Sequence, residues 1–308
     1  MKYIRNSLDF NVEEKSVVTL GKFDGLHRGH ELLIREILRL SKVQEYASVV
    51  FTFDIPPKAK INDLSYKVLT TNEEKQHIFE NTGVDYLIEC PFTKEVMCME
   101  PKEFISWISS RLNMKYVVVG DDFRFGHNRQ GDYQTLMAYE EEFGYQTIVV
   151  SKIQDNGRDI SSTYIREEIS SGNIHKANNL LGYEYLIKSQ VIHGNRIGRT
   201  IGIPTINMQF PEDKLLPPNG VYVTRVTIDD KSYMGVTNIG SKPTVSESGQ
   251  IGVETHILDF NEDVYNKFIA VSFLDFIRSE KKFHSLEELQ SQMQQDIAYT
   301  RNYYENVT

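Results

Sequence analysis

The feature that most constrains the fold of this chain is a change in the spacing of its predicted strands near residue 183. Before this point, β-branched runs such as SVVTLGKFDG and ASVVFTF alternate with helical segments, the first of which is predicted over His27–Leu40. Strands separated by helices of about 10–15 residues are typical of a parallel sheet with helices on both faces. We therefore expect residues 1–182 to form one α/β domain that binds ligands beyond the carboxyl ends of its strands.

After the helical run STYIREEISSGNIHKANNLLG, the chain contains five or six short, closely spaced strands, and Asp229-Asp230-Lys231 is a candidate hairpin link. This pattern predicts a small closed β-barrel. Ser285 and Glu288 have the spacing of a capping box and precede apolar residues at helical intervals. We expect residues 183–308 to form a barrel domain with one C-terminal helix.

The charge balance limits the partners of the chain. Its 308 residues include 34 Lys and Arg against 43 Asp and Glu, a formal net charge of -9 that is unfavourable for binding a nucleic-acid backbone. The sequence has no apolar run of the roughly 20 residues that span a membrane, and its first residues are too charged for a signal peptide. Cys90 and Cys98 lack metal-binding spacing. We expect a cytoplasmic protein, monomeric or weakly oligomeric, without nucleic-acid or membrane partners.

The run Gly21–His30, GKFDGLHRGH, follows the first long strand and opens a helix. Helix N-termini bind anions, glycines let the backbone approach a phosphate, and His27 and His30 are spaced to donate to its oxygens from one face. An ordinary tight turn with surface histidines is the alternative, and a metal pair is disfavoured because no third ligand lies nearby. The other candidate phosphate-binding residues of this run are Gly21, Phe23, Asp24 and Gly29.

The segment ISSTYIR at residues 160–166 is a second candidate anion site. Thr163 is suited to cap a helix, and capping alone is one interpretation. Arg166 would then fall in the first turn, where a cation opposes the helix dipole but suits a bound anion. We predict that Ser162, Thr163 and Arg166 contact a phosphate.

The segment GDDFRFG, which follows a predicted strand, is less specific. Phe123 and Phe125 have the spacing to flank a planar ring, and Asp122 to bind a polar edge of it. An aromatic pair after a strand is equally typical of a core, so both interpretations stay open.

In the second half, Thr205 and Asn207 lie two apart on a predicted strand and therefore face the same side. Their oxygens are suited to share Mg²⁺ with nucleotide phosphates, although such residues are also common at strand edges. Glu254, an acid amid apolar strand residues, is a candidate general base or a member of a barrel salt bridge. The glycine-rich segment before this strand adds the candidate phosphate-binding residues Gly194, Gly198 and Arg199.

Together these segments resemble the bacterial bifunctional riboflavin kinase/FMN adenylyltransferases, the prokaryotic FAD synthetases. The matching runs cover nearly the whole chain in order: GKFDGLHRGH, GDDFRFG, ISSTYIR, GRTIGIPTIN, GVYVTRV, GVTNIGSKPT, VETHILDF and RSEKKF. The resemblance implies a nucleotidyltransferase-like Rossmann-type domain that joins FMN to AMP from ATP. It also implies a β-barrel kinase that makes FMN from riboflavin with ATP and Mg²⁺.

The resemblance further implies roles in the first domain. His27 and His30 would stabilise charge on the α-phosphate of ATP as the FMN phosphate attacks. Ser162, Thr163 and Arg166 would hold the departing phosphates. The candidate flavin-binding residues are Asp122, Phe123, Phe125 and, in the barrel domain, Arg278 of the RSEKKF run.

In the barrel domain, Thr205 and Asn207 would bind Mg²⁺ and ATP phosphates, and Glu254 would accept the proton of the ribityl hydroxyl. Two positions depart from the family: Asp54-Ile55-Pro56-Pro57 replaces a Pro-His-Pro, and Ile206 replaces an alanine. A monofunctional adenylyltransferase with a degenerate barrel, or a flavin-binding protein without turnover, are the alternatives. The presence of the candidate catalytic residues argues against a pure binder: His27, His30, Arg166 and Glu254.

Overall fold

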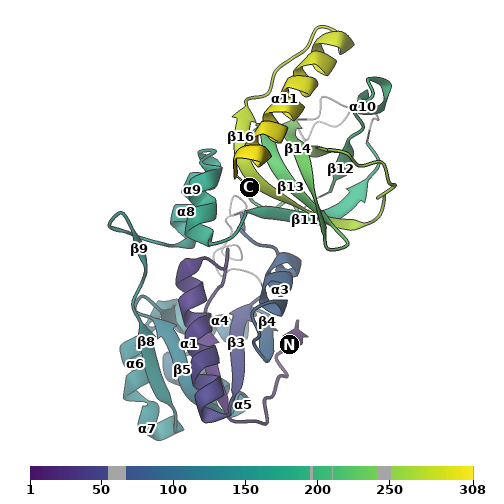
Figure 1. Cartoon of the computed structure of the whole chain (residues 1–308). Helices are drawn as coiled ribbons and strands as arrows, with labels where there is room; N and C mark the ends of the chain where they lie inside the picture. Colours follow the sequence, from purple (N-terminus) through teal and green to yellow (C-terminus); the bar gives the residue numbers. More distant parts are fainter. Residues whose placement is uncertain (55–66, 195–196, 210, 242–250, 308) are drawn as a thin grey trace. The chain divides into compact units, whose positions relative to one another are not determined.

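The computed structural model describes residues 1–54, 67–194, 197–209, 211–241 and 251–307. Its contacts divide the chain into two compact units, Met1–Ser162 and Thr163–Thr308 (Figure 1). This division separates packed bodies, whereas the boundary expected at residues 182 and 183 separates functional domains and stays a prediction. Among the described residues, no helix is long and apolar enough to cross a membrane.

The first unit is built on a six-stranded parallel sheet in the order β1-β4-β3-β2-β5-β8. Sequential strands run from β2 through β3 to β4 on one side, and β5 then pairs on the other side of β2. A crevice beyond the strand ends at such a reversal is a common ligand site. The strands are β1 (Lys2–Arg5), β2 (Ser16–Leu20), β3 (Ala47–Phe53), β4 (Tyr86–Cys90), β5 (Met114–Gly120) and β8 (Gln146–Val150).

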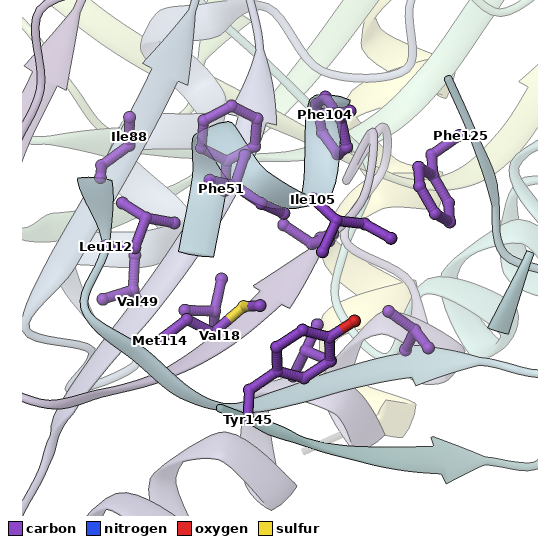
Figure 2. Close-up of a cluster of buried hydrophobic side chains, with 14 of the residues drawn as sticks. Val18, Val49, Phe51, Ile88, Phe104, Ile105, Leu112, Met114, Phe125 and Tyr145 are labelled. Carbon is purple, nitrogen blue, oxygen red and sulfur yellow. The ribbon is translucent and has the colours of Figure 1, made fainter. Parts of the chain in front are cut away.

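Helices cover both faces of this sheet, as the buried strands require. One face carries Val18, Val49 and Ile88, which pack with Ile105 of α5 in the cluster shown in Figure 2. The alternate residues face the other side, where α1 lies over β2, β3 and β5. The helices are α1 (Arg28–Gln44), α3 (Asn72–Glu80), α4 (Lys94–Cys98), α5 (Pro101–Arg111), α6 (Tyr133–Ala138) and α7 (Glu140–Phe143), with a 3₁₀ turn at His127–Arg129.

Several short elements were not predicted from the sequence. Strand β1 adds an edge to the sheet by pairing with β4. Two small hairpins follow β5 and β8: β6 (Arg124–Phe125) with β7 (Gly131–Asp132), and β9 (Gln154–Asp155) with β10 (Arg158–Asp159). The helical segment after β7 is divided into two short helices that meet at Tyr139.

The second unit is a closed antiparallel barrel in the order β11-β12-β15-β14-β13-β16, preceded by two helices, and the expected barrel is confirmed. β16 closes it by pairing with both β11 and β13. The helices are α8 (Ser162–Ser170), which opens with the last residue of the first unit, and α9 (Ile174–Leu181), with α10 (Ile197–Thr200) inserted between β11 and β12. The strands are β11 (Leu186–Ile192), β12 (Ile206–Met208), β13 (Gly220–Ile228), β14 (Lys231–Ser241), β15 (Ile251–Ile257) and β16 (Phe268–Arg278).

Two local predictions for the barrel agree with the structure. Ile228 pairs with Lys231, and φ is 46° at Asp229 and 63° at Asp230, the left-handed pair that a two-residue hairpin loop needs. The C-terminal helix α11 (Leu286–Val307) begins after Ser285, whose hydroxyl accepts from the Glu288 amide at 3.1 Å. Half of the predicted capping box is thus present, because the Glu288 carboxylate accepts from the His284 amide rather than from that of Ser285.

Strand alternation divides the barrel residues between two faces. Val221 and Val236 face outward and pack with Ile297 of α11. The interior face carries a buried chain of hydroxyls in which Thr237 lies 2.8 Å from both Thr224 and Thr255. Any side chain opposite these residues in register can therefore be assigned to one face.

Candidate active sites

The first unit contains a cavity of about 370 Å³ at the carboxyl ends of β2, β5 and β8. It is the crevice expected beside the reversal in strand order. Its lining includes polar residues at the N-terminus of α1, called here the polar end, and a group of phenylalanines, called the aromatic end. Its lining includes Gly21, Lys22, His27, Gly29, His30, Phe53, Phe92, Asp122, Phe123, Phe125, Arg129, Lys152, Ser161 and Ser162.

The polar end is formed by the two predicted histidines. His27 is the N-cap of α1 and makes no side-chain capping bond, so the first amides of this 17-residue helix keep their capacity for an anion. The rings of His27 and His30 stack at 3.8 Å and 19°, and both Nδ1 atoms are buried without a hydrogen-bond partner in the described part of the chain. A Cβ on Gly29 would lie 3.1 Å from His27 Nδ1, so glycine there leaves room for this ring.

Burial determines the charge of these histidines. It lowers the pKa of His27 to about 4, an effect that the nearby Asp122 carboxylate opposes. It also lowers the pKa of His30 well below its ordinary value, and the adjacent His27 adds to this. Both rings are therefore neutral at pH 7 and offer an N–H donor rather than a positive charge. Unsatisfied buried donors fit an anionic oxygen that would enter the cavity.

The pKa of His27 predicts an acid sensitivity of the first unit. The unfolded chain takes up this proton near pH 6.5 and the folded unit only near pH 4, so stability is lost as the pH falls through that interval. The difference corresponds to about 3 kcal/mol. We expect His27→Gln to reduce the loss of unfolding free energy between pH 7 and pH 4 by about this amount. Urea unfolding followed by Trp107 fluorescence measures it, and parallel pH profiles of the two proteins would contradict it.

Phe23 and Asp24 of the Gly21–His30 run do not line the cavity but hold the turn that carries its residues. The Asp24 carboxylate accepts from the amides of Leu69 and Thr70 at 2.8 and 3.1 Å. Phe23 is fully buried and packs on the His30 ring at 5.0 Å. The turn that carries them is strained, with φ of 45° at Phe23, and these contacts hold it.

The aromatic end contains the predicted pair. Phe123 and Phe125 lie 5.5 Å apart with nearly parallel rings, and both line the cavity. Phe125 also belongs to the core cluster of Figure 2, where it packs against Phe104, so the core and ligand interpretations both hold for it. Sequence reasoning missed Phe53 and Phe92, which meet edge-to-face at 4.8 Å in the same lining.

Lys152 is a second residue that sequence reasoning missed. Its Nζ lies 3.1 Å from carboxylate oxygens of both Asp122 and Asp159. It lies two residues after the end of β8, and its position after a strand of a parallel sheet was the available signal. This lysine joins the end of β5 to the segment that leads into ISSTYIR.

The structure divides the ISSTYIR residues between the two units. Ser161 and Ser162 line the cavity, and the Ser162 hydroxyl donates to the Asp24 carbonyl at 2.8 Å. Thr163 is the second residue of α8, so the expectation that it is the N-cap is wrong. Arg166 is the fifth residue of α8 and lies just beyond the first turn in which we expected it. Thr163 and Arg166 belong to the second unit.

The barrel has its own cavity of about 370 Å³. It takes in the predicted residues Arg199 and Thr205, together with Ile206. Tyr265, which was not predicted, contacts Arg199 through its hydroxyl at 3.2 Å, and its ring is tilted against the His193 ring with centroids 3.8 Å apart. The full lining is Arg199, Gly202, Pro204, Thr205, Ile206, Thr255, Ile257, Phe260, Asn261, Glu262, Asp263, Val264 and Tyr265.

Asn207 and Glu254 lie on the outer face of the barrel, outside this cavity lining. Asn207 pairs with Glu254, which also pairs with Asn238 on β14. Glu254 is half-buried beside two asparagines, so the apolar surroundings expected from its neighbours in sequence are wrong. Ile206 pairs with Thr255 and thus faces the interior. The predicted catalytic acid therefore has polar neighbours suited to orient it.

Glycines permit two close approaches before β12. A Cβ on Gly194 would clash with the Asn207 amide, so glycine lets this amide lie against the backbone without shifting. A Cβ on Gly198 would lie 2.2 Å from the Ile203 carbonyl oxygen. Both predicted phosphate-binding glycines thus shape the segment around Asn207.

Arg278, predicted to bind flavin, forms a bidentate ion pair with Asp296 of α11. Nε and Nη2 lie 2.9 and 2.8 Å from the carboxylate oxygens, and Asp296 is buried. Its guanidinium also lies 5.8 Å from the Phe283 ring. The pair fixes the end of β16 to the C-terminal helix.

The donor chemistry of the barrel is compatible with Mg²⁺. Thr205 and Asn207 supply hydroxyl and amide oxygens, which suit this ion, and Mg²⁺ commonly keeps few protein ligands beside water and phosphate. Within the described ranges, no group of three or more His, Cys, Asp or Glu side chains is placed to hold a metal.

An open parallel sheet with a histidine-lined helix N-terminus, followed by a closed barrel with its own cavity, is the arrangement expected of a two-site nucleotide-dependent transferase. The FAD synthetase family model matches residues 9–164, and the riboflavin kinase family model matches residues 181–304. The chain belongs to the family of bifunctional riboflavin kinase/FMN adenylyltransferases. It is a transferase whose two family domains succeed each other along the chain.

Individual relatives agree with this assignment. The bifunctional riboflavin kinase/FMN adenylyltransferase of Escherichia coli (strain K12) is 34% identical over 99% of this chain and 98% of its own length. Those of Bacillus subtilis (strain 168) and Listeria monocytogenes are 34% and 32% identical, over 96% and 94% of this chain and 94% and 92% of their own lengths. A solved structure from Streptococcus pneumoniae, described as a macrolide-efflux protein, covers 98% of both chains with a TM-score of 0.87 and 32% identity.

Proposed function

We propose that this chain phosphorylates riboflavin to FMN in its barrel and joins FMN to AMP from ATP, giving FAD and pyrophosphate, in its first unit. The observation that carries the proposal is the presence of both family domains, in order, each with a cavity lined by predicted site residues. A monofunctional enzyme would need only one of these cavities. Relatives that cover nearly the whole chain carry both activities in their names.

For adenylyl transfer, an FMN phosphate oxygen bonds to the α-phosphorus of ATP as the bond from that phosphorus to pyrophosphate breaks. His27, His30 and the first amides of α1 donate to the α-phosphate oxygens, where negative charge develops. Gly21 and Gly29 let the backbone approach the phosphates. Ser162, which lines this cavity, holds the pyrophosphate as it leaves. The phosphate contacts expected of Thr163 and Arg166, which belong to the second unit, stay predictions. The protein supplies position and electrostatics rather than a covalent intermediate.

The aromatic end of the first cavity holds the flavin. Phe123 and Phe125 lie against the ring system, and Asp122 contacts a polar edge of it. Phe53 and Phe92 complete the wall. In this proposal the FMN phosphate points toward His27 and His30.

For riboflavin phosphorylation, the ribityl hydroxyl oxygen bonds to the γ-phosphorus of ATP, and ADP leaves. Glu254, oriented by its cross-strand asparagines, accepts the hydroxyl proton. Thr205 and Asn207 would hold Mg²⁺, which would neutralise phosphate charge. Arg199, Gly194 and Gly198 form the phosphate-binding segment, and Arg278 lies at the flavin side.

One incubation tests both activities. Pure protein is mixed with riboflavin, ATP and Mg²⁺, and riboflavin, FMN and FAD are separated chromatographically over time. We expect FMN to appear first and FAD to follow. FAD formation from added FMN, without any FMN from riboflavin, would favour the monofunctional alternative, and the absence of both products would favour a binding protein.

Ile206 gives a smaller prediction for the kinase. Its side chain faces the interior, opposite to that of Asn207, so Ile206→Ala loosens the strand that positions the Mg²⁺ and phosphate ligands. For a half-buried side chain the loss is about 1 kcal/mol, or about a fivefold rise in the KM for ATP. Initial rates of FMN formation at varied ATP measure this, with FAD formation from FMN as the unchanged control. A lowered KM would instead indicate that isoleucine crowds the site.

We also propose that the protein works in the cytoplasm on small molecules, without nucleic-acid partners, as a monomer or weak oligomer. Its acidic charge balance supports this. The functional boundary lies at residues 182 and 183, close to the start of the riboflavin kinase match at residue 181.

A further inference from the structure

The loop that leads into β12 is anchored by side chains rather than by the barrel ladder. The ladder between β12 and β15 covers only Ile206–Met208, and Pro204 has no N–H with which to extend it. Gln290 of α11 donates to the Ile201 carbonyl at 2.9 Å, and His256 Nδ1 lies 2.8 Å from the Pro204 carbonyl oxygen. Two side chains therefore hold the backbone of this loop, which precedes the first ladder pair at Ile206.

The partner of His256 determines which nitrogen of its ring carries the hydrogen. A carbonyl oxygen only accepts, so the hydrogen must be on Nδ1 of the ring. His256 is half-buried on β15, where it follows the interior residue Thr255. The register would bring Thr205 opposite His256 if the ladder continued by one residue. The imidazole thus binds the backbone where the next ladder pair, Thr205 with His256, would otherwise lie.

We propose that His256 is a positioning residue of the kinase site, whose Nδ1–H bond fixes the peptide that carries Thr205. The Pro204 carbonyl and the Thr205 amide belong to one planar peptide unit. Proline fixes φ, so rotation about ψ of Pro204 is the soft motion that would turn this unit, and the His256 bond restrains it. The inference rests on the function proposed above for Thr205.

Two substitutions of His256 distinguish a positioning role from a packing role, because they place the hydrogen-bond donor at different distances from the backbone. The amide of Asn lies as far from the backbone as Nδ1, whereas the amide of Gln lies one bond further out. His256→Asn therefore keeps a donor for Pro204, and His256→Gln displaces it while preserving more of the side-chain volume. His175→Gln, on the exposed side of α9, is the matched control.

The test uses the full chain and two readouts. Hydrogen–deuterium exchange of peptides covering residues 201–209, titrated with Mg²⁺ and ADP, reports nucleotide binding at the barrel alone. The KM for ATP in FMN formation reports the same step during turnover. We expect His256→Gln to raise the ADP concentration that gives half-maximal protection by about 3- to 10-fold, the usual effect of one neutral hydrogen bond. The KM for ATP should rise by the same factor. His256→Asn should stay within about twofold of wild type, and FAD formation from FMN should not change.

The proposal would be overturned if His256→Gln behaved like the wild type. It would also be overturned if His256→Gln and His256→Asn were equally impaired, because this result would indicate that the ring acts through packing. Absence of nucleotide protection in the wild-type peptides would also contradict it. If the wild type protects these peptides but makes no FMN, the proposed kinase activity fails, while the exchange titration still decides the role of His256.

Discussion

His30→Ala is expected to reduce FAD formation from FMN by about 10²–10³-fold, the usual cost of removing one preorganised donor from an oxyanion site. Riboflavin phosphorylation should persist, because the barrel has its own cavity in a separate compact unit. The expected loss comes from the stacked pair, since His30 lies 3.8 Å from the His27 ring and both keep an unpartnered Nδ1 within the described residues. Assays of each half-reaction with its own substrate measure the effect.

Two controls separate chemistry from folding. His77 lies on α3 with 46% of its side chain exposed, so His77→Ala should leave both activities unchanged. His30→Gln keeps more volume against Phe23 and should lose FAD formation with less disturbance of packing. Trp107 fluorescence, which reports the core of the first unit, monitors the fold. Loss of both activities in a folded His30→Ala protein would refute the assignment of one site to each unit.

Regular periodicity predicted the architecture, because burial on a sheet or helix face leaves a repeating pattern in the sequence. The expected strands of the parallel sheet and of the barrel are present, and the family comparisons support both halves. Strand β1 was missed for a physical reason. Its four residues KYIR lack a buried pattern, and pairing with β4, more than 80 residues later, makes them a strand.

Within the sites, local motifs predicted which residues gather but not what each one contacts. Asp24 was expected at a phosphate because it lies in the histidine run. Its carboxylate instead accepts from amides 45 and 46 residues further along the chain, which no local pattern reveals. Phe92 and Lys152 reach the first cavity from different elements, so only the folded sheet brings them together.

Glu254 shows the same limit in the barrel. Its neighbours in sequence are largely apolar, yet register places Asn207 and Asn238 beside it on the outer face. Neighbours across a sheet depend on strand order and register, which a single sequence leaves undetermined. The polar surroundings make Glu254 better suited to orient a substrate hydroxyl than a carboxylate among apolar residues would be.

Glu254→Gln is expected to lower the turnover number for riboflavin phosphorylation by about 10²–10⁴-fold, the usual contribution of a positioned base. The amide keeps the shape and the contacts with the cross-strand asparagines but has no capacity to accept the proton. Riboflavin and nucleotide binding should therefore persist, as measured by calorimetry on the variant. FAD formation from added FMN should continue at the wild-type rate and so report intact protein.

A matched control distinguishes a base from a carboxylate that only adds charge to the domain. Glu305→Gln, at an exposed position of α11, removes the same charge and should retain the rate of riboflavin phosphorylation. A near-normal rate in Glu254→Gln would remove Glu254 from the mechanism, because register alone would then account for its place beside Asn207.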